Sequence, residues 1–184
     1  TSTNTASADE NTTTVKTVIA TDADVTSSVT YSISGGVDQA LFSINNNSGA
    51  LTFDTAPDAE NALDDDKNNE YVVEVTATDG VNNDVQTITI TVTDINDNTP
   101  VISGTFSGTV TEGFPEESVI ATGTISISDV DANDNPAFLA ISGASGVNGY
   151  GDFGLSDGNW TYTVDFDAIV HLDNAESVLD SITL

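Results

Sequence analysis

Residues 87–100 read Thr-Ile-Thr-Ile-Thr-Val-Thr-Asp-Ile-Asn-Asp-Asn-Thr-Pro. The first half alternates Thr with β-branched apolar residues, and this period of two predicts a half-buried strand. Acidic and amide side chains then follow from Asp94 to Asn98. Pro100 has no N–H and restricts the residue before it, so it marks the exit from the strand. A strand that ends in a short acidic linker predicts a domain boundary near residue 99.

The same alternation recurs on both sides of this boundary, for example over Tyr71–Ala77, Ile120–Ile127 and Trp160–Val164. Gly, Asn and Asp clusters separate these runs at regular intervals, which is typical of all-β sandwiches. The length of 184 residues suits two domains. We therefore predict an all-β fold of two tandem Greek-key, immunoglobulin-like β-sandwiches, with domains over residues 1–99 and 100–184.

The chain is strongly acidic, with 30 Asp and Glu against 2 Lys and Arg and a formal net charge of −28. Nucleic acid and anionic membrane surfaces are excluded as partners, because binding to phosphates needs Lys and Arg. An acidic chain can also be disordered, but here 38% of the residues are hydrophobic and they fall in ordered runs. There is no Cys, and no apolar run approaches the ~18 residues of a membrane span. We expect neither disulfides nor membrane insertion.

Short acidic clusters between the apolar runs predict calcium binding, because Ca²⁺ prefers carboxylate, amide and carbonyl oxygens. Two of them, starting at Asp94 and Asp129, also match the opening of an EF-hand loop. Neither has the Gly and Glu that an EF-hand needs further along, so that interpretation fails. The run Asp64–Asp66 leaves two alternatives open, a further cation site or a solvated insertion.

Residues 5–99 resemble a cadherin repeat through several motifs in the family's order. These motifs are Asp9-Glu10-Asn11, Asp22-Ala23-Asp24, Phe42-Ser43-Ile44 with Gly49-Ala50-Leu51, Asp58-Ala59-Glu60, Tyr71 to Asp79, and Asp94-Ile95-Asn96-Asp97-Asn98. The stretch Asp58–Asn69 looks like the bacterial branch of that family.

The resemblance implies Ca²⁺ as the bound ion and assigns its ligands by position. At the end of the first domain and in the linker these would be Glu10, Asp58, Glu60, Asp94, Asn96, Asp97 and Asn98. The next domain would contribute Asp129, Asp131 and Asn133. At the opposite end, facing a preceding repeat, the ligands would be Asp22, Asp24 and Asp79.

Residues 101–184 resemble a VCBS repeat of large bacterial surface proteins. The matching segments are Ile102-Ser103-Gly104, Gly108 to Glu112, Ala121 to Ile125, Asp129-Val130-Asp131, Tyr150 to Phe153, and Gly158 to Tyr162. A VCBS repeat continues past the residues matching Asp180–Leu184, so we expect this domain to be truncated at its C-terminus. The resemblance implies a secreted RTX-type adhesin at a bacterial cell surface, with neighbouring repeats of the same protein as partners.

The function we predict is that of a non-enzymatic extender segment, stiffened by calcium at the junction between the domains. The main alternative is a carbohydrate-binding module that grips an extracellular glycan or cell-surface ligand through exposed aromatic residues. For Trp160 we favour packing in the sandwich core over exposure to a sugar. His171 is the only His and there is no Cys, so zinc binding and His-based acid–base catalysis lack their parts.

Overall fold

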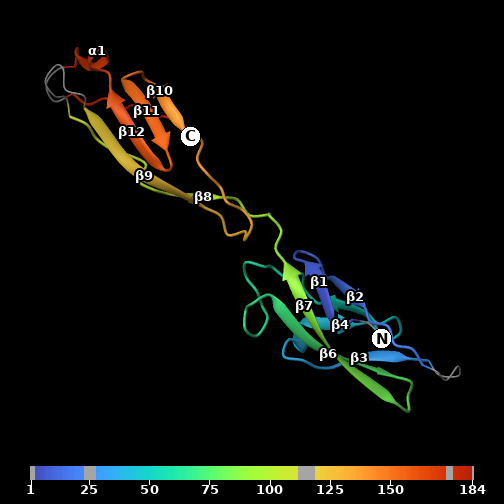
Figure 1. Cartoon of the computed structure of the whole chain (residues 1–184). Coiled ribbons are helices and arrows are strands. Elements are labelled where there is room, and N and C mark those ends of the chain that lie inside the picture. Colours follow the sequence, from blue (N-terminus) through green and yellow to red (C-terminus); the bar gives the residue numbers. More distant parts are fainter. Residues whose placement is uncertain (1–2, 23–27, 112–118, 173–175, 184) are drawn as a thin grey trace. The chain divides into compact units, whose positions relative to one another are not determined.

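The computed structural model describes residues 3–22, 28–111, 119–172 and 176–183. The chain forms two compact units, which are shown in Figure 1. Unit 1 comprises residues 1–97 with 131–133, and unit 2 comprises residues 98–130 with 134–184. The regular secondary structure of both is almost entirely β-strand, which confirms the all-β fold class.

Unit 1 is a sandwich of two sheets. The four-stranded sheet has the order β1 (Thr5–Asp9), β7 (Asn83–Thr93), β6 (Glu70–Thr78) and β3 (Thr30–Gly35). The three-stranded sheet has the order β2 (Thr14–Thr17), β5 (Ala50–Phe53) and β4 (Phe42–Ile44), and a 3₁₀ turn, η1 (Gln39–Leu41), precedes β4. β1 runs parallel to β7 and β2 antiparallel to β5, so the chain changes sheets between β1 and β2.

The core of unit 1 fills the space between these sheets with the inward-facing residues of the alternating strands. Val73 and Ile88 face each other across β6 and β7, and neither is exposed. Phe53 of the smaller sheet packs edge-on against Tyr71, with the ring centres 5.1 Å apart. The alternation seen in the sequence is therefore the alternation between core and solvent.

Unit 2 contains one five-stranded sheet among its described residues. Its order is β10 (Ile141–Ser145), β11 (Gly151–Ser156), β12 (Asn159–Val164), β9 (Ile120–Ser128) and β8 (Val101–Gly104), and a short helix, α1 (Phe166–Ile169), follows β12. The buried apolar side chains described in unit 2 are Ile125, Leu155 and Ile169.

Trp160 on β12 is half-buried in unit 2 and is not among its buried core residues. Its indole N–H donates to the Thr105 carbonyl at 2.7 Å. Gly123 lies on the neighbouring strand β9, and a Cβ placed on it would lie 2.5 Å from the indole ring. The ring therefore packs directly against the backbone of β9. The indole is held by its own unit and does not form an open aromatic platform.

Candidate metal centre

The carboxylate of Glu10 is the structural centre of the predicted metal site. Glu10 follows β1, where the chain leaves the larger sheet, and only 1% of it is exposed. One oxygen accepts the Ala59 N–H at 2.8 Å and the other accepts the Ile95 N–H at 2.7 Å. Three segments distant in sequence are therefore tied together through one buried anion.

The loop after Pro57 places two further carboxylates beside Glu10. Asp58 Oδ1 accepts the N–H groups of Glu60 and Asn61, both at 3.1 Å, which turns the chain tightly. Glu10, Asp58 and Glu60 each offer an oxygen within 4.8 Å of the others.

A second group of carboxylates shares Glu60 with the first. Glu60, Asp94 and Asp131 also offer oxygens within 4.8 Å of one another. Asp131, which belongs to unit 1, is 3% exposed, and Asp94 Oδ2 accepts the neighbouring Ala132 N–H at 2.8 Å. Glu60 thus lies where it can contribute to two adjacent cations.

The surroundings of Glu60 disfavour the ionised form of its carboxyl group. Partial desolvation, a hydrogen bond shared with Asp94 and the charge of Glu10 raise the pKa of Glu60 from its ordinary 4.5 to about 7. When no cation is bound, Glu60 is therefore partly protonated near neutral pH. A divalent ion would relieve this repulsion and keep the ionised form.

The donor set fits calcium. Two oxygens on opposite sides of a Ca²⁺ ion are about 4.6–5.2 Å apart, because each Ca–O distance is 2.3–2.6 Å. The separations of up to 4.8 Å in both groups suit this geometry. Asp94 Oδ1 is buried and accepts no hydrogen bond from the described residues, which leaves it available to a cation.

The predicted ligands of the linker are more exposed than those of the cluster. Asn96, Asp97, Asn98 and Asn133 all face solvent. Asp97 Oδ2 accepts the Asn11 amide N–H at 2.6 Å, which ties the linker to the residue after Glu10. Asp129 follows the end of β9, is half-buried and belongs to unit 2.

The set predicted for the opposite end of unit 1 is only partly visible. Asp24 lies outside the described residues, and Asp22 is exposed. Asp79 accepts the N–H groups of Val81 at 2.8 Å and Asn82 at 2.6 Å in a turn. These hydrogen bonds lower the pKa of Asp79 below its ordinary value.

A second buried acidic feature is formed by Asp38 and the loop 64–70; the sequence pointed to Asp64–Asp66 but not to Asp38 or to the burial of Asp64. Asp38 is 4% exposed and accepts the N–H groups of Asp65 at 2.9 Å and Val72 at 2.7 Å. Asp64 is 2% exposed and accepts the Asn68 N–H at 2.8 Å. These carboxylates hold the insertion against β6, a role that no local sequence motif predicts.

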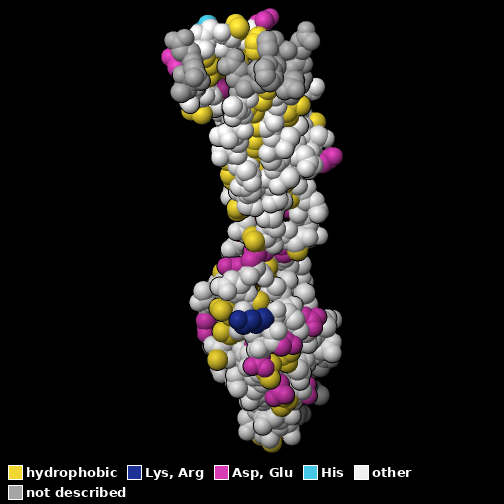
Figure 2. Space-filling view, turned by 90° about the vertical axis from the view of Figure 1, so that its left-hand side faces the viewer, with side chains coloured by type: hydrophobic (Ala, Val, Ile, Leu, Met, Phe, Trp, Pro, Cys, Tyr) yellow, Lys and Arg dark blue, Asp and Glu magenta, His cyan; other side chains and the backbone are white. Residues whose placement is uncertain are grey.

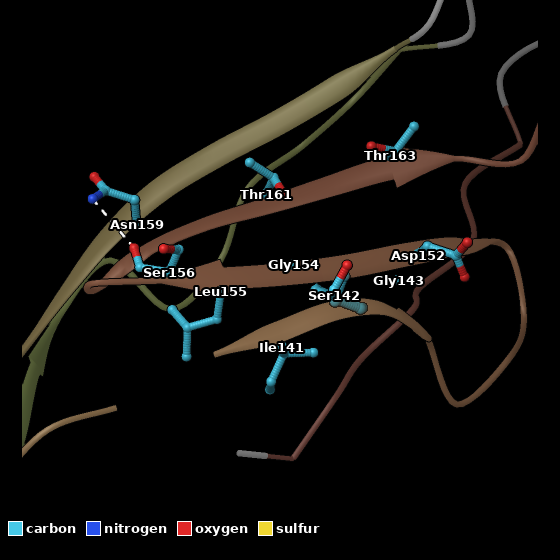
Figure 3. Close-up of a pocket in the computed structure, with 11 residues that line it drawn as sticks. Ile141, Ser142, Gly143, Asp152, Gly154, Leu155, Ser156, Asn159, Thr161 and Thr163 are labelled. Carbon is cyan, nitrogen blue, oxygen red and sulfur yellow. Dashed lines mark hydrogen bonds between the residues drawn. The ribbon is translucent and has the colours of Figure 1, made fainter. Parts of the chain in front are cut away.

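A groove lies along β10, β11 and β12 of unit 2, with Ile141 and Leu155 among its lining residues (Figure 3). Hydroxyl-bearing side chains such as Thr161 and Thr163 line it, and Gly143 and Gly154 leave its floor without side chains. Phe153 also contributes to the lining, but its ring packs against Tyr162 with centres 4.6 Å apart. The groove therefore offers polar and aliphatic contacts and no free aromatic face among the residues described around it.

Acidic side chains gather over unit 1 on the face shown in Figure 2, whereas the visible surface of unit 2 is mostly neutral. Among the described residues, no helix combines the length and apolar character needed to cross a bilayer.

Comparison with known proteins places this acidic cluster in a family context. Residues 4–93 match the family model of the cadherin domain. Protocadherin Fat 1 of Homo sapiens is 34% identical over 149 residues, which are 78% of this chain and 3% of that protein. Cadherin-related family member 2 of Mus musculus is 37% identical over 123 residues, which are 66% of this chain and 9% of that protein. The chain thus spans a small part of these relatives.

Solved structures agree at the level of the fold. A crystal structure of human protocadherin-24 EC1-2 matches with a TM-score of 0.59 and 17% identity, covering 89% of this chain and 76% of that one. The cis-dimer structure of protocadherin gammaB7 EC3-6 matches with a TM-score of 0.55 and 24% identity, covering 89% of this chain and 37% of that one. The family match covers the strands and the Glu10, Asp58 and Glu60 carboxylates of unit 1, so residues 4–93 of this chain are a cadherin domain.

Proposed function

We propose that this chain is a calcium-dependent, non-enzymatic extender segment of a large extracellular adhesin at a bacterial cell surface. In this proposal residues 1–99 form the cadherin domain and residues 100–184 form a VCBS-type domain. Neighbouring repeats of the same adhesin are the partners of both ends.

The observation that carries the calcium proposal is the sharing of Glu60 between two carboxylate groups. Glu10 and Asp58 form one group with it, and Asp94 and Asp131 form the other. Without a cation the ionised form of Glu60 is disfavoured, because desolvation, then a hydrogen bond with Asp94 and the charges of Glu10 and Asp94 raise its pKa to about 7. Each Ca²⁺ would supply two positive charges and fix several oxygens at once.

Binding at this cluster would couple calcium to the linker. Asp94 and Ile95 begin the linker, and Ile95 N–H is already held by Glu10 at 2.7 Å. Ligation of Asp94, with Asn96, Asp97 and Asn98 as further ligands, would stop the linker from sampling other conformations. Asp129, Asp131 and Asn133 would connect the following domain to the same ions. Calcium would then rigidify the junction, with Asp22, Asp24 and Asp79 serving a junction to a preceding repeat.

The carbohydrate-binding alternative would use the groove of Figure 3. Sugar-binding sites combine polar groups with apolar and aromatic side chains. Here Trp160 rests on Gly123 and Phe153 packs against Tyr162. We therefore favour the extender function.

Calorimetric titration with Ca²⁺ tests the proposal, together with small-angle scattering in the presence and absence of a chelator. We expect saturable binding and a reduced spread of shapes with calcium. Glu60→Gln should weaken binding at both adjacent positions, because it removes the shared charge. Glu70→Gln is the matched control, since Glu70 is exposed at the start of β6. Equal binding by the two variants, or no change in scattering on chelation, would contradict the proposal.

A further inference from the structure

Asn148 and Gly149 lie in the turn that joins β10 to β11 in unit 2, and they form the only Asn-Gly step of the chain. Both residues are exposed. Gly149 has a φ of +71°, and a Cβ placed on it would meet nothing within 4 Å. Gly149 has no side chain of its own, and the space beside its Cα is open.

An Asn-Gly step undergoes a known intramolecular reaction when its backbone can rotate. The glycine nitrogen loses its proton and attacks the asparagine Cγ, so a C–N bond forms. The Cγ–Nδ2 bond breaks and Nδ2 leaves as ammonia, giving a five-membered cyclic imide. Water then opens the ring at either carbonyl to give aspartate or isoaspartate. One water is consumed, one ammonia is released, and nothing is oxidised or reduced.

The segment 176–183 closes over this turn through Asp180, in an arrangement that we term the Asp180 clasp. Asp180 accepts the N–H groups of Asn148 and Tyr150, both at 2.9 Å, and the Tyr162 hydroxyl at 3.1 Å. The Val147 N–H also donates to the Ser181 carbonyl at 2.8 Å.

The clasp holds one of the two groups that the reaction needs, and the turn itself holds the other. The leaving amide of Asn148 donates through Nδ2 to the Leu179 carbonyl at 2.8 Å. The attacking nitrogen of Gly149 donates to the Gly146 carbonyl at 3.0 Å. Segment 176–183 belongs to no strand, so it depends on these few contacts, and such segments open locally far more often than a core strand.

We propose that Asn148 is a site of spontaneous deamidation and that opening of the Asp180 clasp sets its rate. The product places a carboxylate beside Asp180 and removes the Nδ2 donor to Leu179. The new carboxylate and the Asp180 carboxylate would repel each other, so deamidation would weaken the Asp180 clasp that had slowed the reaction. Segment 176–183 would then be released progressively as the protein ages.

Peptide mapping of the full chain, incubated at neutral and mildly alkaline pH, tests this inference. Isoaspartate should accumulate at Asn148 before any other Asn and faster at higher pH, because Gly149 must lose its proton. Asp180→Asn should raise the rate about tenfold, the effect of about 1.4 kcal/mol in the opening equilibrium. Asp167→Asn makes the same charge change outside the clasp and should leave the rate unchanged.

A comparison that needs no variant uses a free peptide with the sequence of residues 146–150. The folded chain should react more slowly than this peptide, whereas equal rates would show that the clasp does not protect Asn148. Trp160 emission reports whether unit 2 stays folded in the Asp180→Asn protein. If that variant stays folded and reacts at the wild-type rate, or if another Asn reacts first, the inference is overturned.

Discussion

At the scale of single residues, Glu10 combines a structural role with a proposed ligand role. Its oxygens accept the Ala59 and Ile95 N–H groups, and 1% of the residue is exposed. Glu10→Gln replaces one of the two carboxylate oxygens by an NH₂ group, which cannot accept a hydrogen bond. One of the two backbone N–H groups then loses its acceptor. We expect a loss of about 2 kcal/mol in the free energy of unfolding even without calcium, together with weaker calcium binding.

Urea unfolding of calcium-free protein measures the first effect and calcium titration the second. Glu70→Gln again provides an exposed Glu→Gln change for comparison. Wild-type stability of the Glu10→Gln protein in calcium-free buffer would show that the two backbone contacts of Glu10 contribute nothing.

Glu60 predicts how the calcium-free protein responds to pH. Its pKa is raised from 4.5 to about 7 in the folded chain, chiefly by desolvation and then by Asp94. The folded state therefore binds more protons than the unfolded state in this window. Stability should fall as pH rises from 4.5 to about 7.

Thermal melting of calcium-free protein across this pH range checks the sign, and Glu60→Gln should flatten the dependence. Saturating calcium should reverse the trend, because an ion must displace the proton from Glu60. An unchanged pH profile in Glu60→Gln would show that other carboxylates cause the effect.

At the scale of secondary-structure elements, Asp38 links the region before η1 to the insertion and to β6. Asp38→Ala would leave the buried N–H groups of Asp65 and Val72 without their acceptor. Each unsatisfied buried donor costs roughly 1–3 kcal/mol, so we expect a total loss of about 3 kcal/mol in unfolding free energy. Chemical denaturation measures this loss. Asp84→Ala, at an exposed position on β7, should be nearly neutral.

The elements show which parts of the structure could be predicted from sequence. The alternation in β6 and β7 follows directly from one buried and one exposed face, so these strands were predictable. Glu10 and Asp58 were predictable because ordered family motifs carry them. The contacts of Asp38 join residues 27 and 34 positions apart. The parallel pairing of Thr5 with Thr89 spans most of unit 1. Such long-range pairings leave no periodic signal in a single sequence.

At the scale of the whole molecule, the two units differ in what stabilises them. All the buried apolar side chains described here, except Ile125, Leu155 and Ile169, belong to unit 1. Burial of apolar area is the main favourable term in folding. Unit 1 also carries the two carboxylate groups that share Glu60. Calcium should therefore further stabilise the unit that is already the more stable.

We therefore predict that the chain unfolds in two steps, with unit 2 first. Trp160 is the only Trp and lies in unit 2, so its fluorescence should follow the earlier transition, while far-UV circular dichroism should record both. Calcium at about 100 times its dissociation constant should stabilise the later step by about 2.7 kcal/mol. Glu60→Gln should reduce that gain. The prediction is wrong if fluorescence and dichroism report one and the same transition, both in the presence and in the absence of calcium. In that case the smaller core of unit 2 would not make unit 2 less stable than unit 1.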